Sequence, residues 1–259
     1  MDRLHVKTMS DLVQEGIQPD FLLWVGSAGS FDDRAKKITR SLVKILNKAD
    51  VSFGVLGTEE SSSGDAAKRA GNEFLFQMQA MMNIEILNSY NVKKIITACP
   101  HSYNTLKNEY KGLGGCFKVF HHTQFILKLI KENKITVGDK LRGKRITYHD
   151  PCYLGRGNNI YEEPRKLLEY LGVEIIEMKR SRRLSFCCGA GGAQMFKEPE
   201  PGRIDININR TEEALSLSPD VVATGCPFCN TMLSDGVKTI DDQSPTMVMD
   251  IAELISDNL

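Results

Sequence analysis

The sequence predicts an α/β fold made of two pseudo-symmetric halves with parallel sheets, produced by an internal duplication. Short apolar runs alternate with segments of helical spacing, and this pattern starts again after the polar stretch 133–143. A Cys-Pro motif occurs once in each half, at Cys99 and Cys226. Strands that alternate with helices form parallel sheets through right-handed crossovers. We therefore expect two domains, 1–140 and 141–259.

The first half begins with an apolar run that ends at Gly26, as a buried strand does before a turn. Acidic residues then mark a helix start at 30–33, and apolar residues follow at helical spacing as far as Leu46. The later elements repeat this order. The expected strands are 21–25, 51–56, 94–98 and 117–120, and the further helices are 65–90, 105–110 and 124–131.

The second half repeats the alternation with shorter elements. Its first run leads directly into His149-Asp-Pro151, and its third leads into the second Cys-Pro motif. The expected strands are 145–149, 173–177, 221–223 and 246–249, and the expected helices are 164–171, 211–216, 229–237 and 251–254. Parallel sheets of this kind bind ligands at the carboxyl ends of their strands, so both motifs fall where a site is expected.

Composition excludes several classes of protein. The 33 basic residues balance the 33 acidic ones, so charge gives no reason to expect nucleic acid or a membrane surface as partner. The first residues contain no apolar signal segment, and no apolar run approaches the roughly 20 residues that span a bilayer. We expect a cytoplasmic protein. Seven clustered cysteines in such a protein indicate metal or redox chemistry rather than disulfides.

The two halves match most clearly around the Cys-Pro motifs, where 96–106 resembles 222–232. At similar offsets, three cysteines of the second half fall opposite serines of the first. The expected pairs are Cys152 with Ser27, Cys188 with Ser62, and Cys229 with Ser102. We infer that the first half is a duplicate site whose thiols were replaced by hydroxyls. Neutral serine is a poor ligand for iron or zinc, so this site should hold no metal.

The second half keeps a complete set of five cysteines at predicted strand ends: Cys152, Cys187, Cys188, Cys226 and Cys229. Thiolates hold iron–sulfur clusters, and backbone N–H groups hydrogen-bond the sulfurs. The glycine-rich turn 189–192 supplies such N–H groups without side-chain bulk. Five thiolates exceed the four ligands of one zinc ion. The pattern therefore favours a cluster, with a structural zinc site plus a spare thiol as the alternative.

Other interpretations of individual residues stay open. Cys226-Pro-Phe-Cys229 also has the spacing of a thiol–disulfide motif, although such an enzyme does not need the other three cysteines. Cys116 is expected to be a small buried residue. Cys99 is either a remnant in a collapsed pocket or a thiol that faces the cluster or substrate. His149, beside Cys152, is a candidate proton donor, with a structural hydrogen bond as the simpler role.

The spacing Cys-x34-Cys-Cys-Gly-x36-Cys-x2-Cys resembles the CCG cysteine-rich domain of heterodisulfide reductase B subunits and of iron–sulfur subunits in lactate and glycolate oxidation. The resemblance implies two Rossmann-like domains. It also implies that the five cysteines bind a [4Fe-4S] cluster, which is non-cubane in the best-understood members. Family members usually carry two intact copies, so the serines here put two-cluster chemistry in doubt. Such proteins work with a ferredoxin-like partner that supplies electrons.

These observations predict an electron-transfer subunit of an iron–sulfur oxidoreductase. Its partners would be a ferredoxin-like or flavoprotein redox subunit and a small-molecule, disulfide or quinone substrate. The competing hypothesis is a non-catalytic assembly or docking subunit stabilised by zinc on the same scaffold. The identity of the bound metal separates the two.

Overall fold

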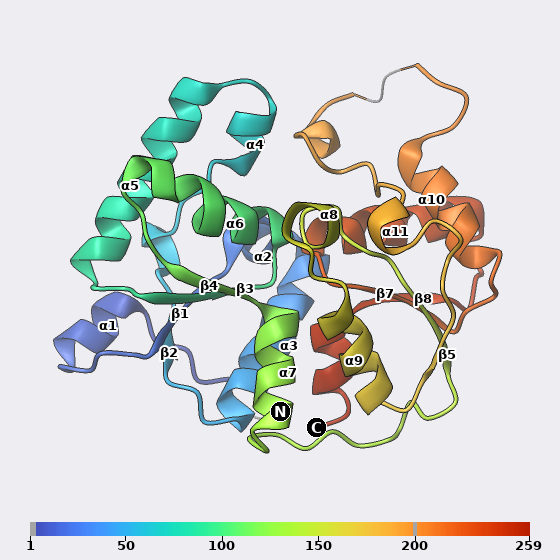
Figure 1. Cartoon of the computed structure of the whole chain (residues 1–259), viewed down its shortest axis with the longest axis horizontal. Coiled ribbons are helices and arrows are strands. Elements are labelled where there is room, and N and C mark those ends of the chain that lie inside the picture. Colours follow the sequence, from blue (N-terminus) through green and yellow to red (C-terminus); the bar gives the residue numbers. More distant parts are fainter. Residues whose placement is uncertain (1–3, 199–200) are drawn as a thin grey trace.

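The computed structural model describes residues 4–198 and 201–259, which form two halves that lie side by side (Figure 1). Each half contains a four-stranded parallel sheet, in the orders β2-β1-β3-β4 and β6-β5-β7-β8. The predicted fold class is thereby confirmed. The strands are β1 Phe21–Trp24, β2 Phe53–Gly54, β3 Lys94–Thr97, β4 Lys118–His121, β5 Arg145–Tyr148, β6 Glu174–Ile175, β7 Val221–Thr224 and β8 Met247–Asp250.

Helices cover both faces of each sheet. In the first half they are α1 Met9–Gln14, α2 Gly26–Phe31, α3 Asp33–Lys48, α4 Asp65–Arg69, α5 Glu73–Ser89, α6 Pro100–Asn104 and α7 His122–Lys131. In the second half they are α8 Gly155–Asn158, α9 Glu162–Tyr170, α10 Ile206–Leu215, α11 Pro227–Ile240 and α12 Ile251–Ser256. No helix in the described part of the chain is long and apolar enough to cross a membrane.

The single helix expected over 65–90 is wrong, because the chain breaks there into α4 and α5. Gly71 adopts a left-handed φ of +85°, which ends α4. Asn72 then caps α5 by accepting a hydrogen bond from the Leu75 backbone at 3.0 Å. The glycine and asparagine turn signals at the middle of the pattern therefore outweigh its helical periodicity.

Strand register shows that the two sheets are equivalent position by position. Leu23 of β1 pairs with Ile96 of β3, and Tyr148 of β5 pairs with Ala223 of β7. The second member of each pair lies three residues before its Cys-Pro motif. Leu23 therefore corresponds to Tyr148, and the residue that follows β1 by three, Ser27, corresponds to Cys152.

The two halves share one hydrophobic core. It joins buried residues of β1, β3, α3 and α7 to buried residues of β5, β7, α9 and α12. Helix α3 packs against α12 and α11, and α7 packs against α9. Two polar contacts cross the same interface. Arg34 bonds both carboxylate oxygens of Glu253 at 2.6 and 2.7 Å in a partly buried pair, and Nε2 of the fully buried His122 lies 2.8 Å from Asp250 Oδ1. The two halves therefore form one unit, and the strand-end sites of both sheets belong to it.

Replacing Asp250 with alanine is expected to lower the free energy of unfolding by about 3–5 kcal/mol, because it leaves a fully buried His122 without its partner. The same change removes the carboxylate that accepts from the Ala252 backbone at the start of α12. Urea unfolding followed by circular dichroism measures the change. Asp241→Ala, which removes an exposed carboxylate that also accepts a backbone N–H, is the control and should shift stability by less than about 0.5 kcal/mol.

Candidate metal centre

The structure brings the five predicted cysteines together at the carboxyl edge of the second sheet. Cys152 follows β5, Cys187 and Cys188 lie in the long loop before α10, and Cys226 and Cys229 begin α11. The sulfurs of Cys188 and Cys229 lie within 4.8 Å of each other, and Cys188, Cys226 and Cys229 form one buried cluster. Cys187 is close enough to Cys152 and Cys188 for the three thiols to shift one another's pKa. The five sulfurs therefore form one continuous group.

Local backbone features place these sulfurs. Cys226 is the N-cap of α11, Pro227 occupies the first helical position, and Cys229 lies one turn on, so both thiols face the same way. Gly189 has φ +92°, and its N–H donates to Cys187 Sγ at 3.3 Å. A Cβ on Gly189 would lie only 3.2 Å from Ile206 Cβ. Glycine is required here by both conformation and space.

The thiols oppose one another's ionisation. Hydrogen bonds from Cys152 and Cys188, together with the Gly189 N–H, lower the pKa of Cys187 far below its ordinary value. The same contacts with Cys187 raise the pKa of Cys152 and of Cys188. Burial and mutual repulsion thus prevent five free thiolates from coexisting, whereas a cationic centre bound among them would remove the conflict. The donor set fits an iron–sulfur cluster by this test.

His149 lies against this group but cannot act as a ligand. One of its ring nitrogens is within 4.8 Å of the sulfurs of Cys188 and Cys229. Arg210 Nε donates to His149 Nδ1 at 3.0 Å, and arginine has no lone pair to offer in return. Nδ1 is therefore unprotonated and engaged, and Nε2 carries the proton. Neither nitrogen has a free lone pair for a metal, and burial, with the Arg210 charge beside it, lowers the His149 pKa to about 3.

His149→Gln is accordingly expected to keep its full metal content, measured per chain after anaerobic purification. A zinc site built from His149, Cys188 and Cys229 would instead lose about 10- to 100-fold or more in affinity when a ligand is removed. Cys188→Ser is the comparison, because it removes a sulfur from the same group. Metal loss in His149→Gln as severe as in Cys188→Ser would contradict the tautomer argument.

The first half contains the counterpart of this site, and the pairing expected from sequence needs one correction. The Gly64 N–H donates to Ser62 Oγ at 3.2 Å, as the Gly189 N–H does to Cys187. Gly64 has φ +85°, close to the +92° of Gly189. Ser62 therefore corresponds to Cys187, and the expected pairing of Ser62 with Cys188 is wrong by one residue. Ser63, which sequence comparison missed, takes the place of Cys188.

All five ligand positions of the second half therefore have a counterpart in the first. The Oγ atoms of Ser63 and Ser102 lie 3.5 Å apart, matching the contact between Cys188 and Cys229. Ser27 follows β1, and Cys99 is the N-cap of α6. Cys99 is buried, and burial raises its pKa to about 12. The first site therefore presents four hydroxyls and a neutral thiol. Cys116, by contrast, was expected to be buried and is exposed.

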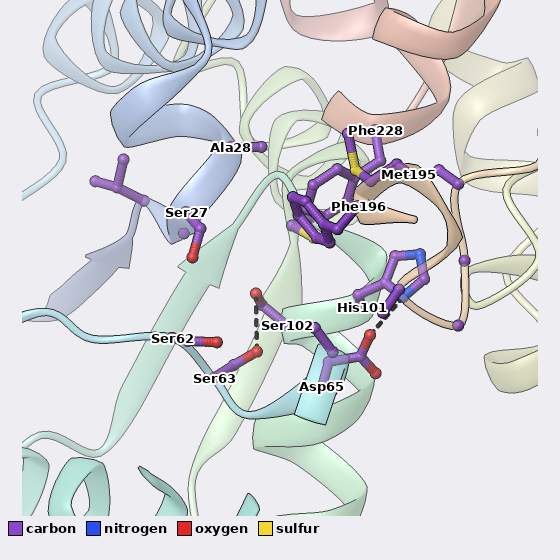
Figure 2. Close-up of a pocket in the computed structure, with 18 residues that line it drawn as sticks. Ser27, Ala28, Ser62, Ser63, Asp65, His101, Ser102, Met195, Phe196 and Phe228 are labelled. Carbon is purple, nitrogen blue, oxygen red and sulfur yellow. Dashed lines mark hydrogen bonds and ion pairs between the residues drawn. The ribbon is translucent and has the colours of Figure 1, made fainter. Parts of the chain in front are cut away.

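The two sites lie next to each other, and each half contributes one residue to the site of the other half. His101, the third residue of the first Cys-Pro motif, packs 4.6 Å from the Tyr153 ring and 5.7 Å from the Phe228 ring, measured between centroids. His101 Nδ1 also lies 2.8 Å from Asp65 Oδ2. Phe228, the matching residue of the second motif, lines the same cavity as the serines of the first site (Figure 2). Burial opposes a charge on His101, but Asp65 and the facing sulfurs raise its pKa.

A duplicated α/β fold with five thiols at one strand-end crevice defines a cysteine-rich, metal-binding class of protein. The chain belongs to the CCG cysteine-rich domain family, whose model matches residues 27–107 and 146–234. The two matched segments fall one in each half, as the duplication requires. The resemblance stated from the sequence is thereby confirmed.

The relatives share this segment as part of longer chains. The chain is 45% identical to the EtfAB:quinone oxidoreductase of Syntrophomonas wolfei over 98% of its own length and 37% of the relative's. It is also 45% identical to the probable iron-sulfur-binding oxidoreductase FadF of Bacillus subtilis, with 98% and 36% covered. For the heterodisulfide reductase D polypeptide of Methanosarcina barkeri the identity is 34%, with 93% and 59% covered. The chain thus spans 36–59% of the length of these three relatives.

Solved structures give only a distant likeness. Glutamate racemase RacE1 of Bacillus anthracis aligns with 98% of this chain and 80% of its own, at 15% identity and a TM-score of 0.39. A similarity of this size carries no inference about activity.

Proposed function

We propose that the chain holds one iron–sulfur cluster on Cys152, Cys187, Cys188, Cys226 and Cys229 and transfers electrons as part of an oxidoreductase. The observation that carries the proposal is the grouping of all five thiols at one sheet edge, three of them in a buried cluster. The family resemblance supports a [4Fe-4S] cluster of non-cubane form. Iron–sulfur relatives at 45% identity support the same class of chemistry.

Zinc fits this arrangement less well. One zinc ion takes four ligands, which would leave a fifth thiol beside it without a role. His149, the nitrogen ligand nearest to the sulfurs, has both ring nitrogens engaged. A zinc-stabilised docking subunit is therefore the alternative hypothesis that metal analysis must distinguish from the cluster.

When bound, such a cluster supplies one-electron oxidation and reduction. The protein's own residues set the conditions for that chemistry. The Gly189 N–H stabilises negative charge on the Cys187 sulfur, and the neutral His149 ring keeps a fixed protonation state beside Cys188 and Cys229. His101 and its Asp65 partner close the site from the first half.

The electrons must reach this site from another centre. Of the seven cysteines, only Cys99 and Cys116 lie outside the group of five, and they are too few to hold a second cluster. We propose a ferredoxin-like or flavoprotein redox partner, either a separate subunit or a neighbouring domain such as the longer relatives have room for. Among those relatives, one is named for quinone and one for a heterodisulfide, so a small-molecule acceptor of either class is proposed.

The proposal is tested by measuring iron, acid-labile sulfide and zinc in protein purified without oxygen, with EPR spectra of oxidised and reduced samples. The expected result is about four irons and four sulfides per chain and a signal that changes on reduction. Stoichiometric zinc without sulfide would overturn the proposal and favour the docking subunit.

A further inference from the structure

A cavity of about 160 Å³ occupies the place where the first half would hold its own cluster (Figure 2). One wall carries the hydroxyls of Ser27, Ser62, Ser63 and Ser102. These groups both donate and accept hydrogen bonds, and only one contact joins any two of the four, at 3.5 Å between Ser63 and Ser102. The wall is therefore rich in hydrogen-bonding capacity that a ligand can use.

A buried donor lies behind Gly26, outside the lining of the cavity. Trp24 is fully buried, and its Nε1–H has no partner among the described residues. A Cβ built on Gly26, which lines the cavity, would lie 3.9 Å from Trp24 Nε1 and 3.7 Å from Ser102 Oγ. A buried unpaired donor is costly, and its position close behind Gly26 adds to the polar character of this end of the cavity.

The opposite wall is apolar and continues outward. Phe228, Phe196 and Met195 line both this cavity and a neighbouring one of about 310 Å³, and Phe31 lines only the neighbouring one. The side chains of Phe31 and Phe196 are 84% and 67% exposed, so the outer cavity ends at an apolar surface. The combined space is thus polar at its inner end and apolar toward its mouth.

The charges in the lining exclude an anionic ligand. None of the described residues that line the inner cavity is lysine or arginine. Its one carboxylate, Asp65, is bonded to His101 at 2.8 Å and to Arg69 at 3.2 Å, so it offers no free charge to a cation. His101 also lines the cavity and has a raised pKa, but its Nδ1 is already paired with Asp65. A carboxylate, phosphate or sulfonate would therefore find no unpaired counter-charge here, whereas a neutral molecule would meet hydroxyls and an aromatic face.

We propose that the emptied first site binds the ring of a neutral quinone, with a carbonyl oxygen toward the serine hydroxyls and any apolar tail along Phe196 and Phe31. The inference rests on the proposed function, because it names the acceptor for the five-cysteine site. A ring against Phe228 lies beside a residue that is flanked by Cys226 and Cys229. A first half without a cluster has space for a substrate at this position, which gives the replacement of its thiols a function.

The quinone gains two electrons, passed one at a time through the five-cysteine site from the reduced flavin or ferredoxin-type cluster of the redox partner. It also gains two protons from water, one on each carbonyl oxygen, and leaves as the quinol.

Trp24 is the only tryptophan of the chain and lies behind Gly26, close to the cavity, so its fluorescence reports on a bound quinone. The experiment titrates anaerobically purified, cluster-containing protein with duroquinone, whose fully methylated ring resists addition of thiols, and follows tryptophan fluorescence. Saturable quenching is expected. Ser27→Phe, which fills the shared mouth from an exposed position, should weaken binding at least tenfold. Ser102→Ala should weaken it roughly three- to tenfold through one lost hydrogen bond. Ser216→Ala is the control, because Ser216 is exposed and lines neither cavity, and it should leave the affinity for duroquinone unchanged.

The outcomes separate this inference from the proposed function, because iron and sulfide are measured on the same samples. Unchanged quenching in Ser27→Phe, or tighter binding of the anionic disulfide of mercaptoethanesulfonate than of duroquinone, would overturn the quinone site while leaving the cluster in place. Absence of iron and sulfide from the wild-type protein would overturn the proposed function, whatever the titration shows.

Discussion

Cys187→Ser is expected to remove most of the iron and sulfide from the protein, to below about a tenth of the wild-type content. Cys187 is close enough to Cys152 and Cys188 to shift their pKa values, and its sulfur accepts the Gly189 N–H. Serine is nearly isosteric with cysteine but stays protonated and binds iron poorly. Metal analysis and the EPR signal of the reduced protein measure the effect.

Two other cysteines provide matched controls for this change. Cys116→Ser alters an exposed thiol outside the site, and Cys99→Ser alters a buried thiol of the first site. Both variants should keep the wild-type iron content. Full iron in Cys187→Ser, or equal loss in Cys116→Ser, would show that the five cysteines do not form the ligand set.

Restoring the missing thiols of the first half should raise iron toward twice the wild-type content. Sequence comparison alone suggests changing Ser27, Ser62 and Ser102, which with Cys99 makes four thiols. The structure adds Ser63, because it stands where the second half has Cys188. We therefore expect the fourfold Ser→Cys variant to bind more iron than the threefold one.

The fourfold variant combined with Cys99→Ala is the control, since it has the same four new thiols but lacks the native one. It should return toward the wild-type iron content. Flat iron across the whole series would mean that the first half does not preserve the geometry of the second. In the fourfold variant a restored cluster should also displace duroquinone, which links this series to the proposed quinone site.

The sequence was sufficient for the duplication and for the grouping of the five cysteines, because both depend on motifs with fixed spacing. The Cys-Pro motifs at Cys99 and Cys226 gave the offset between the halves, and strand alternation gave the sheets. The sequence could not show which of Ser62 and Ser63 corresponds to Cys187 and which to Cys188. The offset changes between β1 and β3, and only the left-handed conformations of Gly64 and Gly189 show on which side of the loop the change falls.

The role of His149 was equally hidden in the sequence. Its partner Arg210 is 61 positions away and fully buried, where a charged side chain is not expected without paired groups. Trp24 was predicted only as part of a strand. Its equivalence to His149 follows from the strand register, and its unpaired N–H follows from the packing around it.

The exchange of His101 and Phe228 between the two sites has a consequence for oxygen tolerance. His101 lies over the sulfur group from the other half, against Tyr153 and Phe228, and so covers the side that a separated second half would leave open. Dioxygen attacks exposed iron–sulfur centres and releases their iron. If the proposed cluster binds there, the first half would shield it from oxygen, and His101→Ala should shorten the lifetime of the cluster in air even where its content under anaerobic conditions is normal.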